Sequence, residues 1–206
     1  MSRSLNSKDW LRRHLTDPYV KLAQKDGYRS RSAYKLIEMD EENKLLKPGM
    51  TVIDLGAAPG GWSQVTARKV GGKGRVIAID LLAMAAIPGV TFLKADFSEP
   101  AGLAAMIAAL AGYPADLVLS DMAPNLTGIT VTDQARMFAL AEQALEFSRE
   151  FLKPGGDFLI KVFQGAGYSG YVKAMRQMFA KAAVKKPNAS RAESNEIYLL
   201  GKGKKA

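Results

Sequence analysis

The chain has 206 residues, of which 48% are hydrophobic and 24% charged, as expected for one globular domain. It contains no cysteine, which excludes disulfide scaffolds, cysteine-ligated metal centres and thiolate nucleophiles. His14 is the single histidine, so no histidine cluster is available, and we expect no bound metal. No apolar run approaches the roughly 20 residues of a membrane span, and we expect a cytoplasmic protein without a membrane anchor.

The net charge is +9, and its distribution is more informative than its total. Residues 1–35 carry nine basic and three acidic side chains, residues 36–172 carry eleven and fifteen, and residues 173–206 carry nine and two. A mildly acidic body with two basic ends is typical of a protein that binds a polyanion. The pattern favours a nucleic-acid partner, and the alternative is that the basic side chains only keep the ends soluble.

Residues 1–49 are expected to form a basic helical extension. Asp17-Pro18 reads as a helix cap followed by a first-turn proline, and Gly27 ends that helix. Ser30 is expected to cap a second helix, which runs from Arg31 to about Asn43.

Residues 50–200 show short apolar runs that alternate with helical stretches, and they are expected to form the core. The predicted strands are Thr51–Leu55, Arg75–Ile79, Val90–Leu93, Ala115–Ser120, Phe158–Val162 and Ile197–Leu200. The predicted helices between them are Trp62–Val70, Ala101–Ala111, Thr132–Leu152 and Tyr168–Ala180. This alternation predicts an α/β fold, with a mostly parallel sheet and helices on both faces. Residues 201–206 are expected to be a loose basic tail of this single domain.

The stretch from Val52 to Ser63 runs from a predicted strand through a glycine-rich turn into a helix. It lies at the first crossover of the sheet, where ligands bind off the carboxyl ends of the strands. Gly56 opens the turn, but Ala58 occupies the second position of the dinucleotide fingerprint, and no P-loop lysine follows. The turn is therefore suited to a nucleoside whose other end is not a phosphate, and the plainer interpretation is a tight strand–helix turn.

Two aspartates follow the next two predicted strands. Asp80 lies 24 residues after Gly56, where a carboxylate commonly accepts hydrogen bonds from ribose hydroxyls. Asp96 follows the third strand and can accept a hydrogen bond from an adenine amino group. Each aspartate alone is more often a cap or turn residue. Together, beside the same loop, they outline an adenosine pocket.

Lys161 lies inside an apolar strand, where a lysine is costly unless it is paired or functional. Asp121 ends the preceding strand of the predicted sheet. If these two strands are adjacent, the two side chains meet, so that pairing and function coexist.

Four motifs follow one another along the chain: Asp54–Ser63, Ser120–Asn125, Lys161–Gly165 and Ser190–Tyr198. In this combination the chain resembles the FtsJ/RrmJ-type RNA ribose 2′-O-methyltransferases, from about Trp10 to Tyr198. The resemblance implies a Rossmann-like, seven-stranded S-adenosylmethionine-dependent methyltransferase fold with one antiparallel strand near the C-terminus.

The same resemblance implies roles for individual residues. The catalytic tetrad of the family matches Lys35, Asp121, Lys161 and Glu196. Cofactor-binding positions match Gly60, Trp62, Asp80, Asp96 and Asp121, beside the turn that Gly56 opens. The implied reaction is methylation of an RNA ribose 2′-hydroxyl, at a uridine of 23S ribosomal RNA in the large subunit. The alternatives are 2′-O-methylation of transfer RNA, or a non-catalytic RNA-binding or ribosome-assembly factor on this fold.

A ribose hydroxyl is a poor nucleophile and must lose its proton as the methyl bond forms. A lysine that accepts this proton must be unprotonated near neutral pH, and both burial and a second cation favour the neutral amine. We expect Lys161 to be the base or the group that orients the hydroxyl, with Asp121 aligning it. Methylation of an amine nitrogen is less consistent with Asp121–Asn125, which lacks paired prolines and an aromatic residue.

Basic residues from both ends of the chain are expected to bind RNA beside the pocket, because Lys35 and Glu196 come one from each end. His14 lies in the same stretch and is expected to be a surface residue rather than a catalytic one. We expect the protein to be a monomer. The predicted RNA-binding residues are Arg12, Arg13, Arg29, Arg31, Lys185, Lys186 and Arg191.

Overall fold

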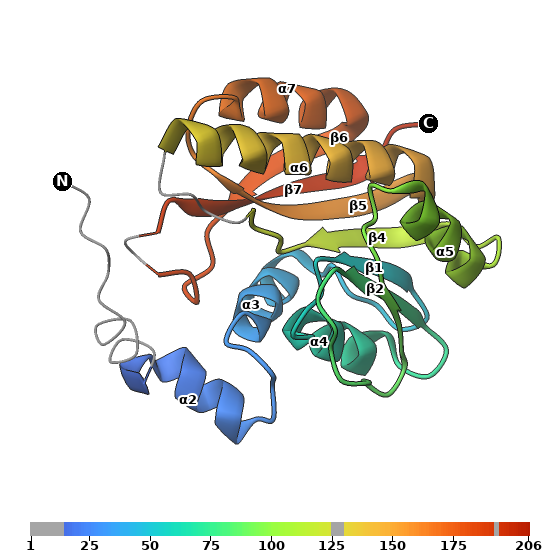
Figure 1. The fold of residues 1–206 in the computed structure, drawn as a ribbon, viewed down its shortest axis with the longest axis vertical. Coiled ribbons are helices and arrows are strands. Elements are labelled where there is room, and N and C mark those ends of the chain that lie inside the picture. Colours follow the sequence, from blue (N-terminus) through green and yellow to red (C-terminus); the bar gives the residue numbers. More distant parts are fainter. Residues whose placement is uncertain (1–14, 125–129, 192–193) are drawn as a thin grey trace.

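The structure is a computed structural model, and it describes residues 15–124, 130–191 and 194–206 (Figure 1). The helices are α2 (Pro18–Lys25), α3 (Ala33–Asn43), α4 (Gly61–Val70), α5 (Pro100–Leu110), α6 (Thr130–Phe151) and α7 (Tyr168–Met178). The strands are β1 (Thr51–Leu55), β2 (Arg75–Asp80), β3 (Val90–Lys94), β4 (Ala115–Ser120), β5 (Leu152–Phe163), β6 (Phe179–Lys185) and β7 (Glu196–Lys204).

The seven strands form one sheet in the order β3-β2-β1-β4-β5-β7-β6. Strand β7 runs antiparallel to both of its neighbours, and the other pairs are parallel. This confirms the predicted α/β fold and the antiparallel strand that the resemblance implies. The chain moves outward from β1 to β3 and then returns to place β4 on the other side of β1. The carboxyl ends of β1 and β4 therefore flank the switch point where ligands bind in such sheets.

Helices cover both faces of the sheet (Figure 1). Alternate residues of a strand point to opposite faces, and β1 follows this rule. Ile53 and Leu55 pack in the cluster that holds the buried residues of α5, α6 and α7, whereas Val52 packs with those of α3 and α4. Burial of each such aliphatic side chain contributes about 1.5–3 kcal/mol.

The helical extension packs against the body of the protein through α3, whose Ala33 and Leu36 are completely buried. The start of α2 is as predicted, because the Asp17 carboxylate accepts a hydrogen bond from the backbone N–H of Tyr19 at 3.0 Å. The predicted start of the second helix is wrong. The helix begins at Ala33, and the Ser30 hydroxyl bonds that of Ser32 at 2.6 Å instead of capping it.

Strand β6 is absent from the predicted elements: the predicted helix Tyr168–Ala180 includes its first two residues, and no strand is predicted over residues 181–185. The strand lies at the edge of the sheet and is stabilised by its pairing with β7. Strand β5 also begins earlier than predicted, at Leu152, which pairs with Ala115. The register then shifts across Pro154-Gly155-Gly156, so that Asp157 pairs with Leu117.

The predicted loose tail at 201–206 is wrong for most of its length, because β7 continues to Lys204. Gly201 is buried and pairs with both Phe158 and Ala182. A Cβ at Gly201 would lie 2.5 Å from the ring of Phe179, so the close packing of β6 and β7 requires glycine there. Within the described part of the chain, no helix is long and apolar enough to cross a membrane.

Candidate active site

A small pocket with a volume of about 40 Å³ lies at the switch point of the sheet. It opens where β1 passes into the glycine turn and where β4 ends, and the segment before α3 closes one side. Its lining residues are Ser32, Asp54, Gly56, Ala57, Ala58, Pro59, Gly61, Trp62 and Asp121.

The glycine turn needs glycine for both conformation and space. Gly56 has φ +73° and Gly60 has φ +107°, which residues with a side chain rarely adopt. A Cβ at Gly56 would lie 2.1 Å from Cγ of Met122, and a Cβ at Gly60 would lie 2.6 Å from Cδ1 of Ile87. Both predicted cofactor glycines therefore allow neighbouring segments to approach the turn closely.

Asp80 and Asp96 lie at the ends of adjacent strands, as predicted. The Asp80 carboxylate accepts hydrogen bonds from the N–H of Ala58 at 2.8 Å and the N–H of Leu82 at 2.7 Å. It therefore joins the glycine turn to the loop after β2. Asp96 accepts from the N–H and the hydroxyl of Ser98, at 2.9 and 2.6 Å, and so stabilises its own turn. Both carboxylates keep acceptor capacity for a ligand, because each one offers about four lone-pair sites.

We expect Asp80→Ala to weaken S-adenosylmethionine binding by about 10–100-fold, the loss of one charge-assisted hydrogen bond together with some loop order. Isothermal titration calorimetry on the variant and the wild-type protein measures this. Asp80→Asn is the control, because its amide oxygen still accepts from Ala58 while the charge is lost, and an intermediate affinity is expected. Equal affinities for all three proteins would contradict the assignment of Asp80 to the ribose.

Trp62 is an internal anchor of α4, although it borders the pocket. Its side chain is buried, its indole N–H donates to the carbonyl of Ser32 at 2.8 Å, and its ring packs on Tyr198 at 5.8 Å between centroids. The residue therefore joins the segment before α3 to β7 behind the glycine turn.

Asp54 is the most buried carboxyl group of the pocket. Its Oδ2 accepts a hydrogen bond from the Ser63 hydroxyl at 2.6 Å, and its Oδ1 has no hydrogen-bond partner among the described residues. Burial raises the pKa of Asp54 to about 7, since the bond from Ser63 offsets only part of the loss of solvent, and Asp121 and Asp80 raise it further. An orphan carboxylate oxygen in a pocket is suited to a cationic group of a ligand.

Lys161 and Asp121 meet as predicted. The Lys161 Nζ lies 3.0 Å from Oδ1 of Asp121 and donates to its backbone carbonyl at 2.6 Å. The same Oδ1 accepts a hydrogen bond from the Tyr198 hydroxyl at 2.7 Å. Lys161 and Tyr198 are direct partners across β5 and β7, so both side chains lie on one face of the sheet.

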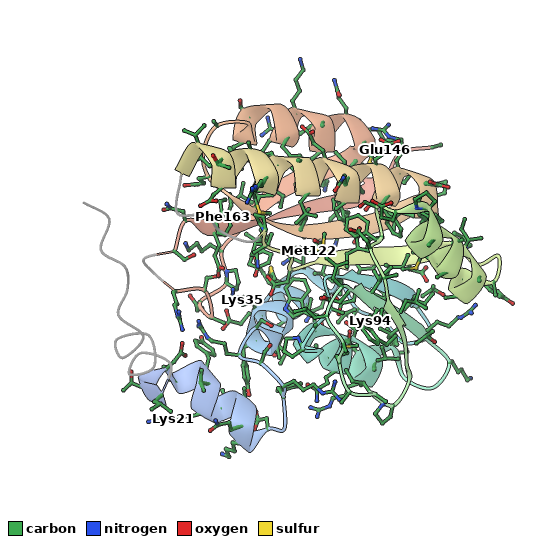
Figure 2. All side chains as sticks on the ribbon, viewed as in Figure 1. Lys21, Lys35, Lys94, Met122, Glu146 and Phe163 are labelled. Atoms are coloured by element: carbon green, nitrogen blue, oxygen red, sulfur yellow. The ribbon has the colours of Figure 1, made fainter. Side chains whose placement is uncertain are left out.

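Lys35 and Glu196, the other two residues of the predicted tetrad, form an ion pair, with Lys35 Nζ 2.5 Å from Oε1 of Glu196. Burial alone would raise the pKa of Glu196, but Lys35, with smaller contributions from Ser190 and Lys161, outweighs it, and the pKa is lowered. Lys35 lies near the carboxyl ends of β4 and β5, which Met122 and Phe163 mark in Figure 2. The pair therefore holds α3, from one end of the chain, to β7, from the other.

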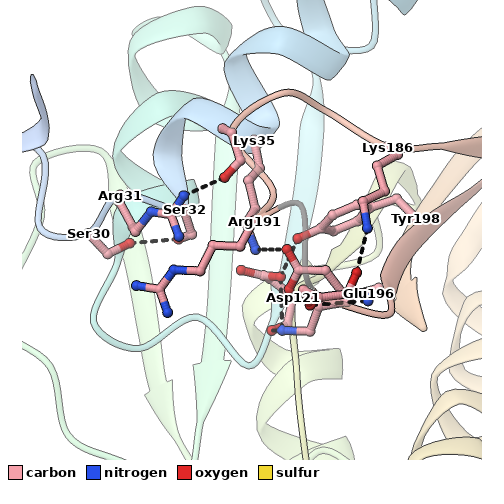
Figure 3. A network of polar contacts seen from close by, with 12 residues as sticks. Ser30, Arg31, Ser32, Lys35, Asp121, Lys186, Arg191, Glu196 and Tyr198 are labelled. Carbon is pink, nitrogen blue, oxygen red and sulfur yellow. Dashed lines mark hydrogen bonds and ion pairs between the residues drawn. The ribbon is translucent and has the colours of Figure 1, made fainter. Parts of the chain in front are cut away.

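Tyr198 connects the two pairs of the predicted tetrad and is not among the predicted site residues. Its hydroxyl binds Asp121, and its ring lies 5.8 Å from the Lys35 ammonium (Figure 3). Burial, together with the nearby Asp121 and Glu196, raises the pKa of Tyr198, so its hydroxyl stays a donor at neutral pH. The signal was in the sequence, because residues two apart on a strand point to the same face, as Glu196 and Tyr198 do.

Three of the predicted RNA-binding side chains are drawn in Figure 3 in the same network of polar contacts as Lys35, Asp121 and Glu196. Arg31 and Arg191 both approach Oδ2 of Asp17, at 3.1 and 3.5 Å. Lys186 donates to the carbonyl of Ser194 at 2.5 Å. Arg31, from one basic end, and Arg191, from the other, therefore come together as predicted. Lys186 binds Ser194, whose hydroxyl accepts a hydrogen bond from the N–H of Glu196.

The remaining basic residues are placed differently. Lys185 pairs with Glu42 of α3 at 2.6 Å, and Arg29 binds backbone carbonyls of two loops. Arg12, Arg13 and His14 lie outside the described residues. Among the described residues, no group of three or more histidine, cysteine, aspartate or glutamate side chains is arranged to hold a metal ion.

Comparison with known proteins gives one family and a set of close relatives. A family model described as FtsJ-like methyltransferase matches residues 28–204. The ribosomal RNA large subunit methyltransferase E of Pseudomonas fluorescens is 56% identical over 203 residues, covering 98% of this chain and 97% of the relative. The protein of the same name from Chromobacterium violaceum is 55% identical over 205 residues and covers 100% of both chains.

Solved structures give the same picture at lower identity. A ribosomal RNA methyltransferase from Plasmodium falciparum superposes with a TM-score of 0.78 at 29% identity, covering 86% of this chain and 98% of the other. Fibrillarin from Aeropyrum pernix, solved with bound S-adenosyl-L-methionine, gives a TM-score of 0.58 at 15% identity, over 84% of this chain and 75% of that one. At that identity the second likeness concerns the fold alone.

Proposed function

The chain belongs to the FtsJ-like methyltransferase family, and from this premise we propose that it methylates a ribose 2′-hydroxyl of RNA, at a uridine of 23S ribosomal RNA. The relatives at 55–56% identity are named ribosomal RNA large subunit methyltransferases, which supports the ribosomal substrate. The observation that carries the chemistry is the contact of Lys161 Nζ with two oxygens of Asp121, a residue that lines the pocket.

The cofactor is S-adenosylmethionine, which supplies a reactive sulfonium methyl group when bound. The residues present fit such a ligand, because the orphan Oδ1 of Asp54 and the bare backbone of Gly56 both border the pocket. We propose that Gly56, Gly60 and the backbone beside Trp62 hold it, with Asp80 at the ribose, Asp96 at the adenine and Asp121 near the methionine end.

In the proposed mechanism Lys161 acts on the hydroxyl that becomes methylated. A neutral amine has two N–H donors and one lone pair. Asp121 offers two acceptors to Nζ, its Oδ1 and its carbonyl, so a neutral Lys161 can satisfy both and direct its lone pair at the ribose hydroxyl. A charged ammonium in the same place would donate its third N–H to the hydroxyl oxygen and orient it.

The other tetrad residues position these groups. The Tyr198 hydroxyl fixes the Asp121 carboxylate, which in turn fixes Lys161. Lys35 and Glu196 stand on the other side of Tyr198 and are proposed to hold the ribose and its neighbouring phosphate. Because both pairs are largely buried, their mutual orientation is set by the sheet and α3 rather than by the substrate.

The proposed RNA surface consists of Arg31, Lys186 and Arg191, together with Arg12 and Arg13 from the undescribed N-terminus. Arg31 and Arg191 share the one carboxylate of Asp17, so this group keeps a net positive charge, whereas Lys185 is a weaker member because Glu42 neutralises it. RNA affinity should fall steeply with salt, and each phosphate-contacting charge that is removed should lower the slope of log K against log salt by about 0.7–0.9. Filter binding of Lys186→Ala and Arg191→Ala measures this. The control is Lys94→Ala, an exposed lysine on the far edge strand (Figure 2), and a slope that falls equally in the control would contradict this surface.

The function is tested by mapping 2′-O-methyl groups in ribosomal and transfer RNA from cells with and without the gene. We expect one uridine of 23S RNA to lose its methyl group, and purified protein to restore it on large subunits with labelled S-adenosylmethionine. Loss of a transfer RNA methyl group would instead support the transfer RNA substrate. Retention of every methyl group would support a non-catalytic assembly factor. We further propose that the protein acts as a monomer in the cytoplasm, on the ribosomal subunit.

A further inference from the structure

The Arg29 side chain spans two loops at the cofactor pocket. Its Nη1 donates to the carbonyl of Pro59 at 3.3 Å, in the glycine turn. The same nitrogen donates to the carbonyl of Ala85 at 2.7 Å, and Nη2 donates to that of Ala86 at 2.8 Å. Ala85 and Ala86 lie in the loop that follows Asp80. One guanidinium therefore ties the glycine turn to the loop that follows Asp80, the residue proposed to bind the cofactor ribose.

The loop from residue 81 to 89 has few internal means of holding its position. It is neither helix nor strand, and its Leu81 and Leu82 side chains are 64% and 69% exposed. Near its end, however, Ile87 is buried over Gly60, close to the Arg29 Nη1. The loop is therefore fixed over the glycine turn at the point where Arg29 binds it.

The backbone of Arg29 is itself anchored. Its N–H donates to Oε1 of Gln64 at 2.8 Å, and Nε2 of Gln64 donates to the carbonyl of Gly27 at 2.9 Å. Gln64 belongs to α4, which begins at the glycine turn. The arginine thus reaches the two loops from a fixed base, and its side chain loses little further freedom when a ligand enters the pocket.

We propose that Arg29 is a positioning residue for the cofactor, which holds both loops in the binding conformation before S-adenosylmethionine enters, and that it is not primarily an RNA-phosphate contact. Both Nη atoms are already engaged by carbonyl oxygens, and a backbone that is ordered in advance binds a ligand at lower cost. The inference rests on the proposed function only for the identity of the cofactor.

The test compares cofactor and RNA affinity in Arg29→Ala and Arg29→Lys. Calorimetry with S-adenosylmethionine alone should give a Kd raised about 10–100-fold in Arg29→Ala, from three lost charge-assisted bonds. Arg29→Lys should recover only part of this, since one ammonium cannot span both loops as the guanidinium fork does. In steady-state assays KM for the cofactor should rise, while kcat at saturating cofactor stays within a few-fold.

Arg68→Ala is the matched control, because the Arg68 guanidinium stacks on the ring of Tyr28, the residue next to Arg29 in the chain, at 4.5 Å. It removes the same charge and should leave cofactor affinity unchanged. Unchanged cofactor affinity in Arg29→Ala, with weaker RNA binding and a smaller salt slope, would overturn the inference, as would full recovery by Arg29→Lys. If Arg29→Ala does not fold, Arg29→Lys decides the question alone. A wild-type protein that binds the cofactor but methylates no RNA would refute the proposed function and leave this inference standing.

Discussion

Lys161→Ala is expected to reduce methyl transfer by roughly 10²–10⁴-fold, the usual worth of a positioned acid–base group. The side chain is buried and pairs with Asp121, so its loss also costs stability, but Asp121 keeps its hydrogen bond from Tyr198. We therefore expect a folded variant that binds S-adenosylmethionine and RNA nearly as well as the wild type. Single-turnover rates at saturating cofactor and RNA measure the chemical step without interference from binding.

Lys161→Arg separates chemistry from ion pairing. A guanidinium keeps its positive charge and still pairs with Asp121, but it has no lone pair to accept a proton. If Lys161 is the base, the arginine variant should be about as slow as the alanine variant. If Lys161 only pairs with Asp121, the arginine variant should regain much of the rate. A folded Lys161→Arg protein that methylates RNA near the wild-type rate would end the catalytic-base interpretation.

The parallel strands were the most predictable part of the fold. β1 and β4 are buried from end to end or nearly so, and their sequences are mostly apolar, with Asp54 as the one charged residue in β1 and Asp116 as the one in β4. The edge strand β6 carries no such signal, because it mixes alanine with exposed lysine. It forms through backbone hydrogen bonds to β7, a partner that lies beyond the reach of any local pattern. The predicted strand ends too early, at Leu200 rather than Lys204, for the same reason, since alternating glycine and lysine at 201–204 are typical of a loose tail.

The tetrad positions came from the resemblance, and the structure adds how they are held. That Tyr198 lies opposite Lys161 depends on the register of β5 against β7, which single-sequence reasoning did not fix. The contacts of Arg29 depend on three segments that are distant in the sequence, so its positive charge alone suggested RNA. The role of a basic side chain near the site of such an enzyme, whether in RNA binding or in holding the fold, is therefore decided by the groups that accept its hydrogen bonds.

Asp54→Asn is expected to remove a pH dependence from the stability of the protein. The pKa of Asp54 is raised to about 7 in the fold, against 3.8 for an ordinary aspartate, so the folded state holds its proton more tightly than the unfolded chain. Its contribution to stability is complete below pH 4 and is lost as the pH rises through 7. Between pH 5 and 8 the wild type should lose about 2–3 kcal/mol relative to Asp54→Asn. Urea unfolding of both proteins across this range measures the difference.

Ser63→Ala serves as the control, because it should enlarge the pH dependence of stability that Asp54→Asn removes. The Ser63 hydroxyl donates to Oδ2 of Asp54 and lowers the pKa of that carboxyl group. Without the hydroxyl, the Asp54 pKa should rise further, and the loss of stability should extend to higher pH. Cofactor binding should respond to the same group, because a cationic ligand favours the carboxylate. Affinity for S-adenosylmethionine should therefore increase from pH 6 to 8 in the wild type, with proton release, and be nearly flat in Asp54→Asn. Parallel pH profiles of stability in wild type and Asp54→Asn would show that Asp54 is already ionised in the free protein.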